Sequence, residues 1–250
     1  HEDELRQYLG RANCIAGLMI AWRPFLGMMW AALSNTSVRG TAGKKMIWTK
    51  QIKIPLDWCL AFIRSERGAM TRIYSLDAYL HRGSTIVITT DASPWAIGGY
   101  IMVDGIIREF FHQRVSEEDA RILNIPLGSC EAQQGMESFG LLVALRLWRR
   151  FWHNRRVVLT VRSDSVAGLT VVLKFRSSGE APSLVARELA IDMARTTYTP
   201  QIVEHIPGVA NVVADILSRH DVPNRSYDVP NYWDALKATP ACLRGATMRV

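Results

Sequence analysis

TIVITTDASPWAIGGYIMVDG, residues 85–105, is the stretch that decides the fold. It begins with a short β-branched run of the buried-strand type, which ends on Asp91. GGYIMV and IIREFFH follow as two further strands, and the Asp104-Gly105 pair between them suits a two-residue type I′ hairpin turn. We therefore expect three consecutive antiparallel strands in this part of the chain.

After this hairpin, helices alternate with strands. An apolar stripe at helical spacing predicts a helix from about Glu131 to Trp152. The elements expected next are the strand VVLTVR, a helix after Ser165, the helix APSLVARELAIDMART, the strand QIVEHI and the helix NVVADILSR. This order predicts an α/β fold with a five-stranded mixed sheet, in which three antiparallel strands are joined by parallel ones and helices flank the sheet.

The 250 residues suffice for one large domain or two smaller ones. The pattern divides them into a helical segment (1–45), a connecting segment (46–84), the α/β domain (85–220) and a tail without an assigned role (221–250). In the first segment, two helices are expected with a break at Arg23-Pro24. In the second, MIWTKQIKI alternates like a strand, and Pro55 is expected to open a helix.

Composition and the N-terminus limit the class of protein. The formal charge of +7 and the pI near 9.5 favour a nucleic-acid partner, although a basic surface also serves solubility. Four scattered cysteines without a CxxC pair indicate neither a zinc site nor a disulfide framework, and favour a reducing, intracellular compartment. The acidic start HEDELRQYLG is no signal peptide and looks like an internal cut from a longer polypeptide. The apolar window around Arg23 predicts no membrane span, because a mid-span arginine is costly.

Four carboxylates stand where the predicted topology brings them to one edge of the sheet. Asp91 ends the first strand, Asp164 follows the fourth, and Glu137 lies on the helix between them. Asp215 sits on the helix after the fifth strand. Crowded carboxylates repel one another, and two divalent cations can stabilise them and catalyse phosphodiester hydrolysis. Each aspartate alone also fits a turn or helix cap, so the prediction depends on their joint placement.

The same residues carry a family resemblance. TTDASPWAIGGYIM, ESFGLLVALRLW, VRSDSVAGL and VEHIPGVANVVADILSR resemble the four blocks of ribonuclease H domains in polyproteins of long-terminal-repeat and tyrosine-recombinase retroelements. The resemblance implies a ribonuclease H-like fold, with Asp91, Glu137, Asp164 and Asp215 as catalytic residues and ligands of two Mg²⁺ ions, for which Mn²⁺ can substitute. Glu137 fits the family register better than Glu131, which is nearly two turns earlier.

A weaker resemblance covers the N-terminal part. ELRQYLGRANCIAGLMIAWRPFLGMMWAAL resembles the thumb that follows a reverse transcriptase palm, and IPLDWCLAFI resembles the connection before the nuclease. An upstream polymerase domain is the implied partner, since no YxDD signature occurs in this chain. The loop PGVAN before the last aspartate lacks the histidine of cellular ribonucleases H, and His205 within the preceding strand is expected to be packed or hydrogen bonded.

Substrate contacts are expected at two places. RLWRRFWHNRRVV combines Arg149, Arg150 and Arg155 with aromatic residues, as a surface that follows phosphates would. The same arginines also fit a helix C-terminus, and the aromatics fit its buried stripe. Ser93 and Asn211, next to the acidic blocks, are candidates for reading the 2′-hydroxyl groups of an RNA strand.

Three functions compete on this evidence. The leading hypothesis is a two-metal endonuclease that cuts the RNA strand of RNA/DNA hybrids as part of a retroelement reverse transcriptase, leaving 3′-hydroxyl and 5′-phosphate ends as the resemblance implies. The second is a domesticated, catalytically silent module of the same fold that binds nucleic acid or serves in assembly. The third, a transposase or integrase, is disfavoured because its last acid is usually a glutamate, where this chain has Asp215.

Overall fold

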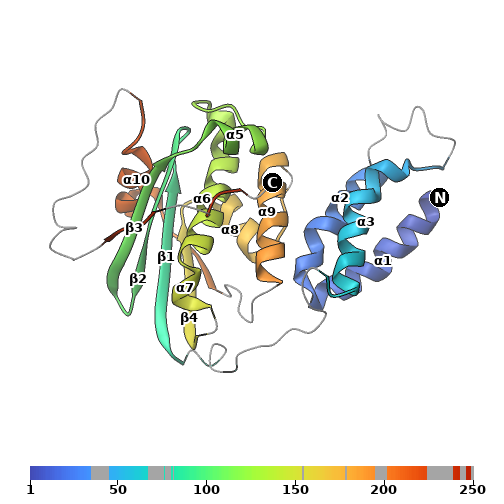
Figure 1. Ribbon diagram of the computed structural model, residues 1–250, viewed down its shortest axis with the longest axis horizontal. Helices are drawn as coiled ribbons and strands as arrows, with labels where there is room; N and C mark the ends of the chain where they lie inside the picture. Colours follow the sequence, from blue (N-terminus) through green and yellow to red (C-terminus); the bar gives the residue numbers. More distant parts are fainter. Residues whose placement is uncertain are drawn as a thin grey trace.

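A computed structural model describes residues 1–34, 45–66, 76, 80, 82–153, 155–177, 179–194, 202–223, 239–242 and 246–248. A mixed β-sheet lies between helix α10 on one face and helices α6, α8 and α9 on the other (Figure 1). Three N-terminal helices pack outside α9, so that layers of helix, sheet and helix are followed by a further helical layer. No helix in the described part of the chain has the length and apolar character needed to cross a membrane.

The sheet contains the five predicted strands and one more. Its strands among the described residues are β1 (Ser84–Ala92), β2 (Ala96–Val103), β3 (Ile106–Arg114), β4 (Val157–Ser163), β5 (Ile202–His205) and β6 (Thr239–Pro240). Their order is β5-β4-β1-β2-β3-β6, with β1, β2 and β3 antiparallel, and β4 and β5 parallel to β1. The predicted α/β, ribonuclease H-like arrangement is therefore confirmed. The sixth strand comes from the tail and pairs in parallel with β3, which would otherwise be an open edge.

Two local features fix β1 and β2. Asp104 and Gly105 both have positive φ, at 51° and 81°, as the predicted type I′ turn requires, and the Asp104 carboxylate accepts a hydrogen bond from the Thr85 amide at 2.8 Å. On β2, a Cβ at Gly98 would lie 2.3 Å from the Ser218 amide nitrogen. Glycine at this position therefore lets α10 lie directly against the sheet.

Helices of the α/β part follow the predicted order with two differences. They are α5 (Glu117–Leu123), α6 (Gln133–Leu147), α7 (Arg149–Trp152), α8 (Val166–Lys174), α9 (Glu180–Met193) and α10 (Val212–Arg219), with short 3₁₀ turns at Cys130–Ala132 and Gly208–Ala210. The single helix predicted up to Trp152 is interrupted at Trp148, whose side chain is buried against Phe111. Helix α5 was not predicted, although Ser116 caps it by accepting a hydrogen bond from the Asp119 amide.

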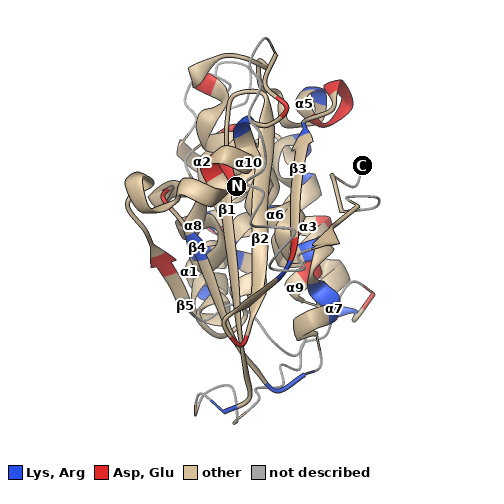
Figure 2. Ribbon diagram, turned by 90° about the vertical axis from the view of Figure 1, so that its left-hand side faces the viewer, with Lys and Arg blue, Asp and Glu red and all other residues tan. Residues whose placement is uncertain are grey.

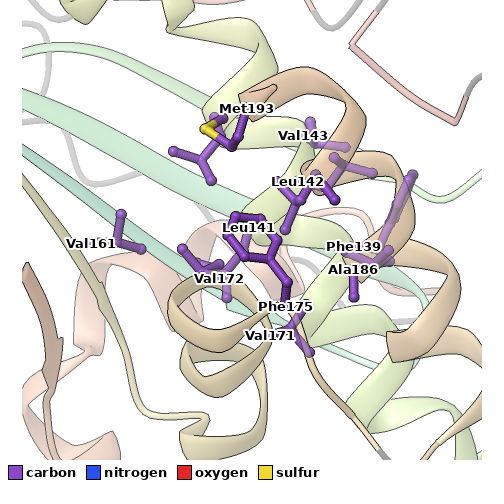
Figure 3. Packing of buried hydrophobic residues seen from close by; sticks show 14 of the residues in the cluster. Phe139, Leu141, Leu142, Val143, Val161, Val171, Val172, Phe175, Ala186 and Met193 are labelled. Atoms are coloured by element: carbon purple, nitrogen blue, oxygen red, sulfur yellow. The ribbon is translucent and has the colours of Figure 1, made fainter. Parts of the chain in front are cut away.

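Helix α6 is the centre of the core. It is buried on every side from Gly135 to Leu145, because it lies between the sheet and helices α8 and α9. Figure 3 shows Phe139, Leu141 and Leu142 of α6 packed among side chains of α8 and α9. Truncating one of these leucines to alanine is expected to cost about 2–5 kcal/mol.

In the N-terminal layer, α1 (Glu2–Leu18), a 3₁₀ turn (Ile20–Trp22), α2 (Arg23–Ser34) and α3 (Thr49–Ile63) are helical as expected, but two boundaries differ. The break precedes Arg23, because Pro24 is tolerated in the first turn of α2. The predicted strand in MIWTKQIKI is wrong from Thr49 onward, since α3 begins there and continues through Pro55. Residues 35–44 of the expected helical segment (1–45) lie outside the described residues.

Candidate metal centre

Three of the four predicted carboxylates converge at one edge of the sheet. Asp91 is next to last in β1, and Asp164 directly follows β4, its parallel neighbour, so both side chains start from the same edge. Glu137 enters from the second turn of α6. One ligand oxygen from each residue lies within 4.8 Å of the other two.

The Glu137 carboxylate is buried and only half satisfied. Its side chain is 7% exposed, and Oε1 accepts a hydrogen bond of 2.6 Å from Gln133 Nε2. Among the described residues, the buried Oε2 has no hydrogen-bond partner. The pKa of Glu137 is raised to about 8, mainly by burial and also by the negative charges of Asp91 and Asp164, although the hydrogen bond from Gln133 lowers it.

The Asp91 carboxylate is also buried, and α10 holds it in place. Its oxygen accepts a hydrogen bond from the Ser218 hydroxyl at 2.5 Å. The pKa of Asp91 is raised to about 7, mainly by burial and also by the charges of Asp164 and Asp215. The hydrogen bond from Ser218 and the nearby Arg219 oppose this rise. Asp91 and Glu137 are thus both difficult to ionise near neutral pH without a cation.

These properties match a site for a divalent cation. Carboxylate oxygens are the ligands that Mg²⁺ and Mn²⁺ prefer. A buried oxygen without a partner costs free energy, which a bound cation would remove at Glu137 Oε2. A cation would also restore the ionised form of Asp91 and Glu137, because opposite charge lowers the pKa of a carboxyl group.

Asp215 occupies a different environment from the other three. It lies in the first turn of α10 with 38% of its side chain exposed, and it forms an ion pair with Arg219 at 2.6 Å. It lies outside the group of ligand atoms formed by Asp91, Glu137 and Asp164, yet its charge contributes to the raised pKa of Asp91. Asp215 therefore borders the cluster rather than completing it.

Ser93 and Asn211 fasten the walls of the site. The Ser93 hydroxyl donates to the Ser218 carbonyl at 2.8 Å, which ties the end of β1 to α10. Asn211 is 2% exposed, and its amide nitrogen donates to the Thr90 carbonyl at 3.3 Å and lies 3.5 Å from Asp164 Oδ1. Both side chains donate hydrogen bonds to backbone carbonyl groups at the sheet edge where the carboxylates meet.

The three predicted substrate arginines lie at the other end of α6. Arg149 is twelve residues beyond Glu137, or about 18 Å along a helix. Figure 2 shows α7, with its blue segments, near the opposite end of the strands from α10. Arg150 forms an ion pair with Glu109, and Arg155 follows on the exposed turn before β4. The structure does not bring these arginines to the carboxylate cluster.

Two residues of the site were missed by the sequence analysis. Gln133 is one turn before Glu137, and it also donates to the Ala92 carbonyl at 2.7 Å, so it links α6 to the end of β1. Its spacing from Glu137 was a usable signal. Ser218 and Asp91 are 127 residues apart in the chain, so no local sequence pattern predicts their hydrogen bond.

His205, expected to be packed or hydrogen bonded, has its Nε2 3.0 Å from the Asp164 carbonyl oxygen. Since a carbonyl only accepts, Nε2 carries the proton in this contact. His205 thus contacts the backbone beside the cluster.

A cleft opens beside the carboxylate cluster. Its volume is about 600 Å³, and it is lined by Ala92, Ser93, Pro94, Trp95, Gln133, Arg219, Val222 and Pro223. Gln133 is shared between this cleft and the hydrogen bond to Glu137. The cleft therefore places the aromatic ring of Trp95 and the positive charge of Arg219 beside the sheet edge that carries the carboxylates.

Comparison with known proteins gives similarity of structure only. No protein-family model and no curated protein matches the chain. RNase H1 from the halophilic archaeon Halobacterium salinarum is similar at 15% identity and a TM-score of 0.40, over 57% of this chain and 98% of that protein. The foamy viral protease-reverse transcriptase, solved in complex with double-stranded DNA, is similar at 12% identity and a TM-score of 0.29, over 73% of this chain and 32% of that one.

Proposed function

We propose that this chain hydrolyses the RNA strand of RNA/DNA hybrids as the ribonuclease H part of a retroelement reverse transcriptase. The observation that carries the proposal is the convergence of Asp91, Glu137 and Asp164, with a buried Glu137 oxygen that has no partner among the described residues. These residues would hold two Mg²⁺ ions, for which Mn²⁺ can substitute, and Asp215 would join them from α10. When bound, the ions would activate water for in-line attack and stabilise the leaving oxygen, giving 3′-hydroxyl and 5′-phosphate ends.

The chain's own residues would prepare the site for this chemistry. Gln133 orients Glu137 from within α6, and Ser218 orients Asp91 from α10, so two carboxylates are fixed before a cation arrives. Asn211, next to Asp164 Oδ1, restrains the third. Such prior ordering reduces the reorganisation needed when the substrate binds.

Substrate binding would use the cleft beside the cluster. Arg219 supplies a positive charge to its lining, and Trp95 supplies an aromatic ring on which a base or sugar can pack. The net charge of +7 favours the approach of a polyanion. Ser93, in the lining, and Asn211 remain our candidates for distinguishing RNA from DNA, acting through the wall that they fasten.

The wider assignment is part of the same proposal. Helices α1 to α3, of which α2 contacts α9, would be the thumb and connection of a polymerase encoded upstream in one polyprotein. The four cysteines are free, which fits a reducing intracellular compartment, cytoplasmic or nuclear.

A cleavage assay with matched variants tests the proposal. With Mg²⁺ and an RNA/DNA hybrid, the wild type is expected to release shortened RNA, and Asp91→Asn and Glu137→Gln are each expected to lose at least about a hundredfold in rate. Glu131→Gln is the control, because it makes the same change on an exposed residue nearly two turns earlier. Equal rates for the wild type and both site variants would overturn the assignment.

One observation favours a second function, a silent nucleic-acid-binding module. The ion pair with Arg219 engages Asp215, the fourth expected ligand, outside the cluster. In that case the wild type would bind the hybrid in a salt-dependent manner but not cleave it with either Mg²⁺ or Mn²⁺. Equal affinity of the wild type and Asp91→Asn, without cleavage by either, would select this function.

A further inference from the structure

A second cluster of metal-ligating side chains lies away from the carboxylates, between β3 and the end of α10. His112 Nδ1 is 2.9 Å from Asp221 Oδ2, and His220 Nδ1 is 3.0 Å from Asp221 Oδ1. The two imidazole ring centroids are 3.8 Å apart. All three side chains are about 30% exposed, so solvent and ions can reach them.

From this arrangement we propose that His112, His220 and Asp221 form a binding site for a transition-metal ion of the Zn²⁺ class. Two imidazole nitrogens and a carboxylate oxygen are a ligand set that suits Zn²⁺, with water in the fourth position. One ligand atom from each residue lies within 4.8 Å of the other two. His112 is 109 residues before Asp221 in the chain, whereas His220 directly precedes it, and the fold brings the three ligand atoms together.

The spacing agrees with such an ion. Zinc bonds of 2.0–2.1 Å in a tetrahedron separate neighbouring ligand atoms by about 3.4 Å. With Asp221 Oδ2 as the ligand oxygen, its contact of 2.9 Å with His112 Nδ1 needs to open by only about half an ångström to admit the ion, while His220 Nδ1 lies 3.0 Å from the other oxygen of the same carboxylate. Each imidazole would then offer the lone pair of Nδ1 and carry its proton on Nε2.

Electrostatics favour an ion over two protonated rings. Two imidazolium groups at a ring separation of 3.8 Å would repel, and the single Asp221 carboxylate neutralises only one of them. Arg219, the adjacent cation, is paired with Asp215 and faces the carboxylate cluster. A divalent ion shared by two neutral rings and one carboxylate removes this repulsion.

A bound ion would pin the C-terminal end of α10 to β3. Helix α10 carries Ser218, which holds Asp91, and Asp215, so the ion would act as a brace behind the carboxylate cluster. The two sites differ in ligand chemistry, since one offers oxygen atoms alone and the other offers two imidazole nitrogens. Zn²⁺ is therefore expected at the histidines, and Mg²⁺ at the carboxylates.

The first test measures zinc binding by thermal unfolding of the whole chain without a polyhistidine tag. Asp91→Asn combined with Glu137→Gln serves as the parent, so that the carboxylate cluster contributes little. Free Zn²⁺ at about a hundred times its Kd is expected to raise the Tm by about 5 °C or more, whereas Mg²⁺ is expected to leave it unchanged. Adding His112→Gln or His220→Gln should abolish the rise, and His1→Gln, which changes an exposed histidine at the N-cap of α1, should preserve it.

The second test locates the ion and does not depend on the stability of a variant. Crystals of the tag-free wild type soaked in Zn²⁺ are expected to show an anomalous peak among the two Nδ1 atoms and the Asp221 carboxylate. A peak at the carboxylate cluster alone, or an equal Tm rise in the histidine variants, would overturn the proposal. Because hybrid cleavage is measured separately with Mg²⁺, this site can fail while the nuclease stands, and the reverse is also true.

Discussion

In its second turn α6 buries the carboxylate of Glu137, and in its last turn it buries the guanidinium of Arg146. Arg146 has a side chain only 5% exposed, yet it is fully engaged: it pairs with Glu188 and Asp192 of α9 and donates to the Thr247 carbonyl at 2.8 Å. Glu137 is similarly buried, but one of its oxygens has no partner in the described structure.

The two buried charges differ in their partners, because Arg146 is paired with carboxylates, whereas Glu137 Oε2 has no hydrogen-bond partner among the described residues. The Arg146 network joins α6, α9 and the docked tail segment, and its charges compensate one another. Glu137 faces Asp91 and Asp164, two groups of its own charge, and the hydrogen bond from Gln133 compensates its negative charge only in part. Burial alone would therefore rank the two residues equally, whereas the identity of their partners distinguishes them.

The largest expected effect is on stability as a function of pH without metal. In the folded state the pKa values of Asp91 and Glu137 are raised to about 7 and 8, so the folded chain binds more protons than the unfolded chain between about pH 4 and 8. The stabilisation is fully present below about pH 4 and is lost as the pH rises through 7–8. The loss is on the order of 5 kcal/mol for each of the two carboxyl groups, at about 1.4 kcal/mol per pKa unit.

Chemical denaturation at several pH values, with EDTA or with Mg²⁺, measures this loss. Mg²⁺ should flatten the decline, because it binds the ionised carboxylates of the folded state only. Glu137→Gln should be less sensitive to pH than the wild type in EDTA, while Glu131→Gln should match the wild type. Identical pH dependence of the free energy of unfolding in the wild type and in Glu137→Gln would mean that the pKa of Glu137 is not raised in the folded state.

The next largest effect is expected when the ion pairs of Arg146, near the end of α6, are removed. Arg146→Met keeps the apolar volume but leaves Glu188 and Asp192 without their shared cation, so we expect a loss of about 3–5 kcal/mol in the free energy of unfolding. Cleavage per folded molecule should stay within about threefold of the wild type, because Arg146 is nine residues, about 13 Å, from Glu137 along the helix. Arg150→Met is the control, since its ion pair with Glu109 is 57% exposed on the arginine side and contributes about 0–1 kcal/mol. A larger loss in the control would contradict this account.

Local patterns were sufficient for the sheet and for three of the carboxylates. β-Branched runs, the Asp104-Gly105 turn and the helical stripe depend on neighbours in sequence, and the parallel pairing of β1 with β4 then places Asp91 and Asp164 at one edge. The register of α6 places Glu137 above them. These features follow from periodicity and connectivity, which a single sequence contains.

Features that depend on distant partners were not predictable. The tail adds β6 beside β3, across more than a hundred residues, and no strand pattern in Thr239–Pro240 announces it. The MIWTKQIKI alternation is overridden because Ile52 packs inward from α3 against the core, where tertiary burial decides over local preference.

The smallest expected effect concerns the hydrogen bond that Glu137 accepts from Gln133 near the beginning of α6. Gln133→Ala removes the hydrogen bond that lowers the pKa of Glu137, so this pKa should rise further, and the acidic limb of the cleavage profile with Mg²⁺ should move to higher pH by less than about one unit. The maximal rate should fall by about tenfold, as expected when a residue that orients a metal ligand is lost. Gln134→Ala is the control, because it changes the adjacent glutamine and leaves the donor to Glu137 in place. If the pH profile moves equally in both variants, the hydrogen bond from Gln133 does not tune Glu137; if it moves only in Gln133→Ala, the unsatisfied carboxylate is the group that sets the response of the site to protons.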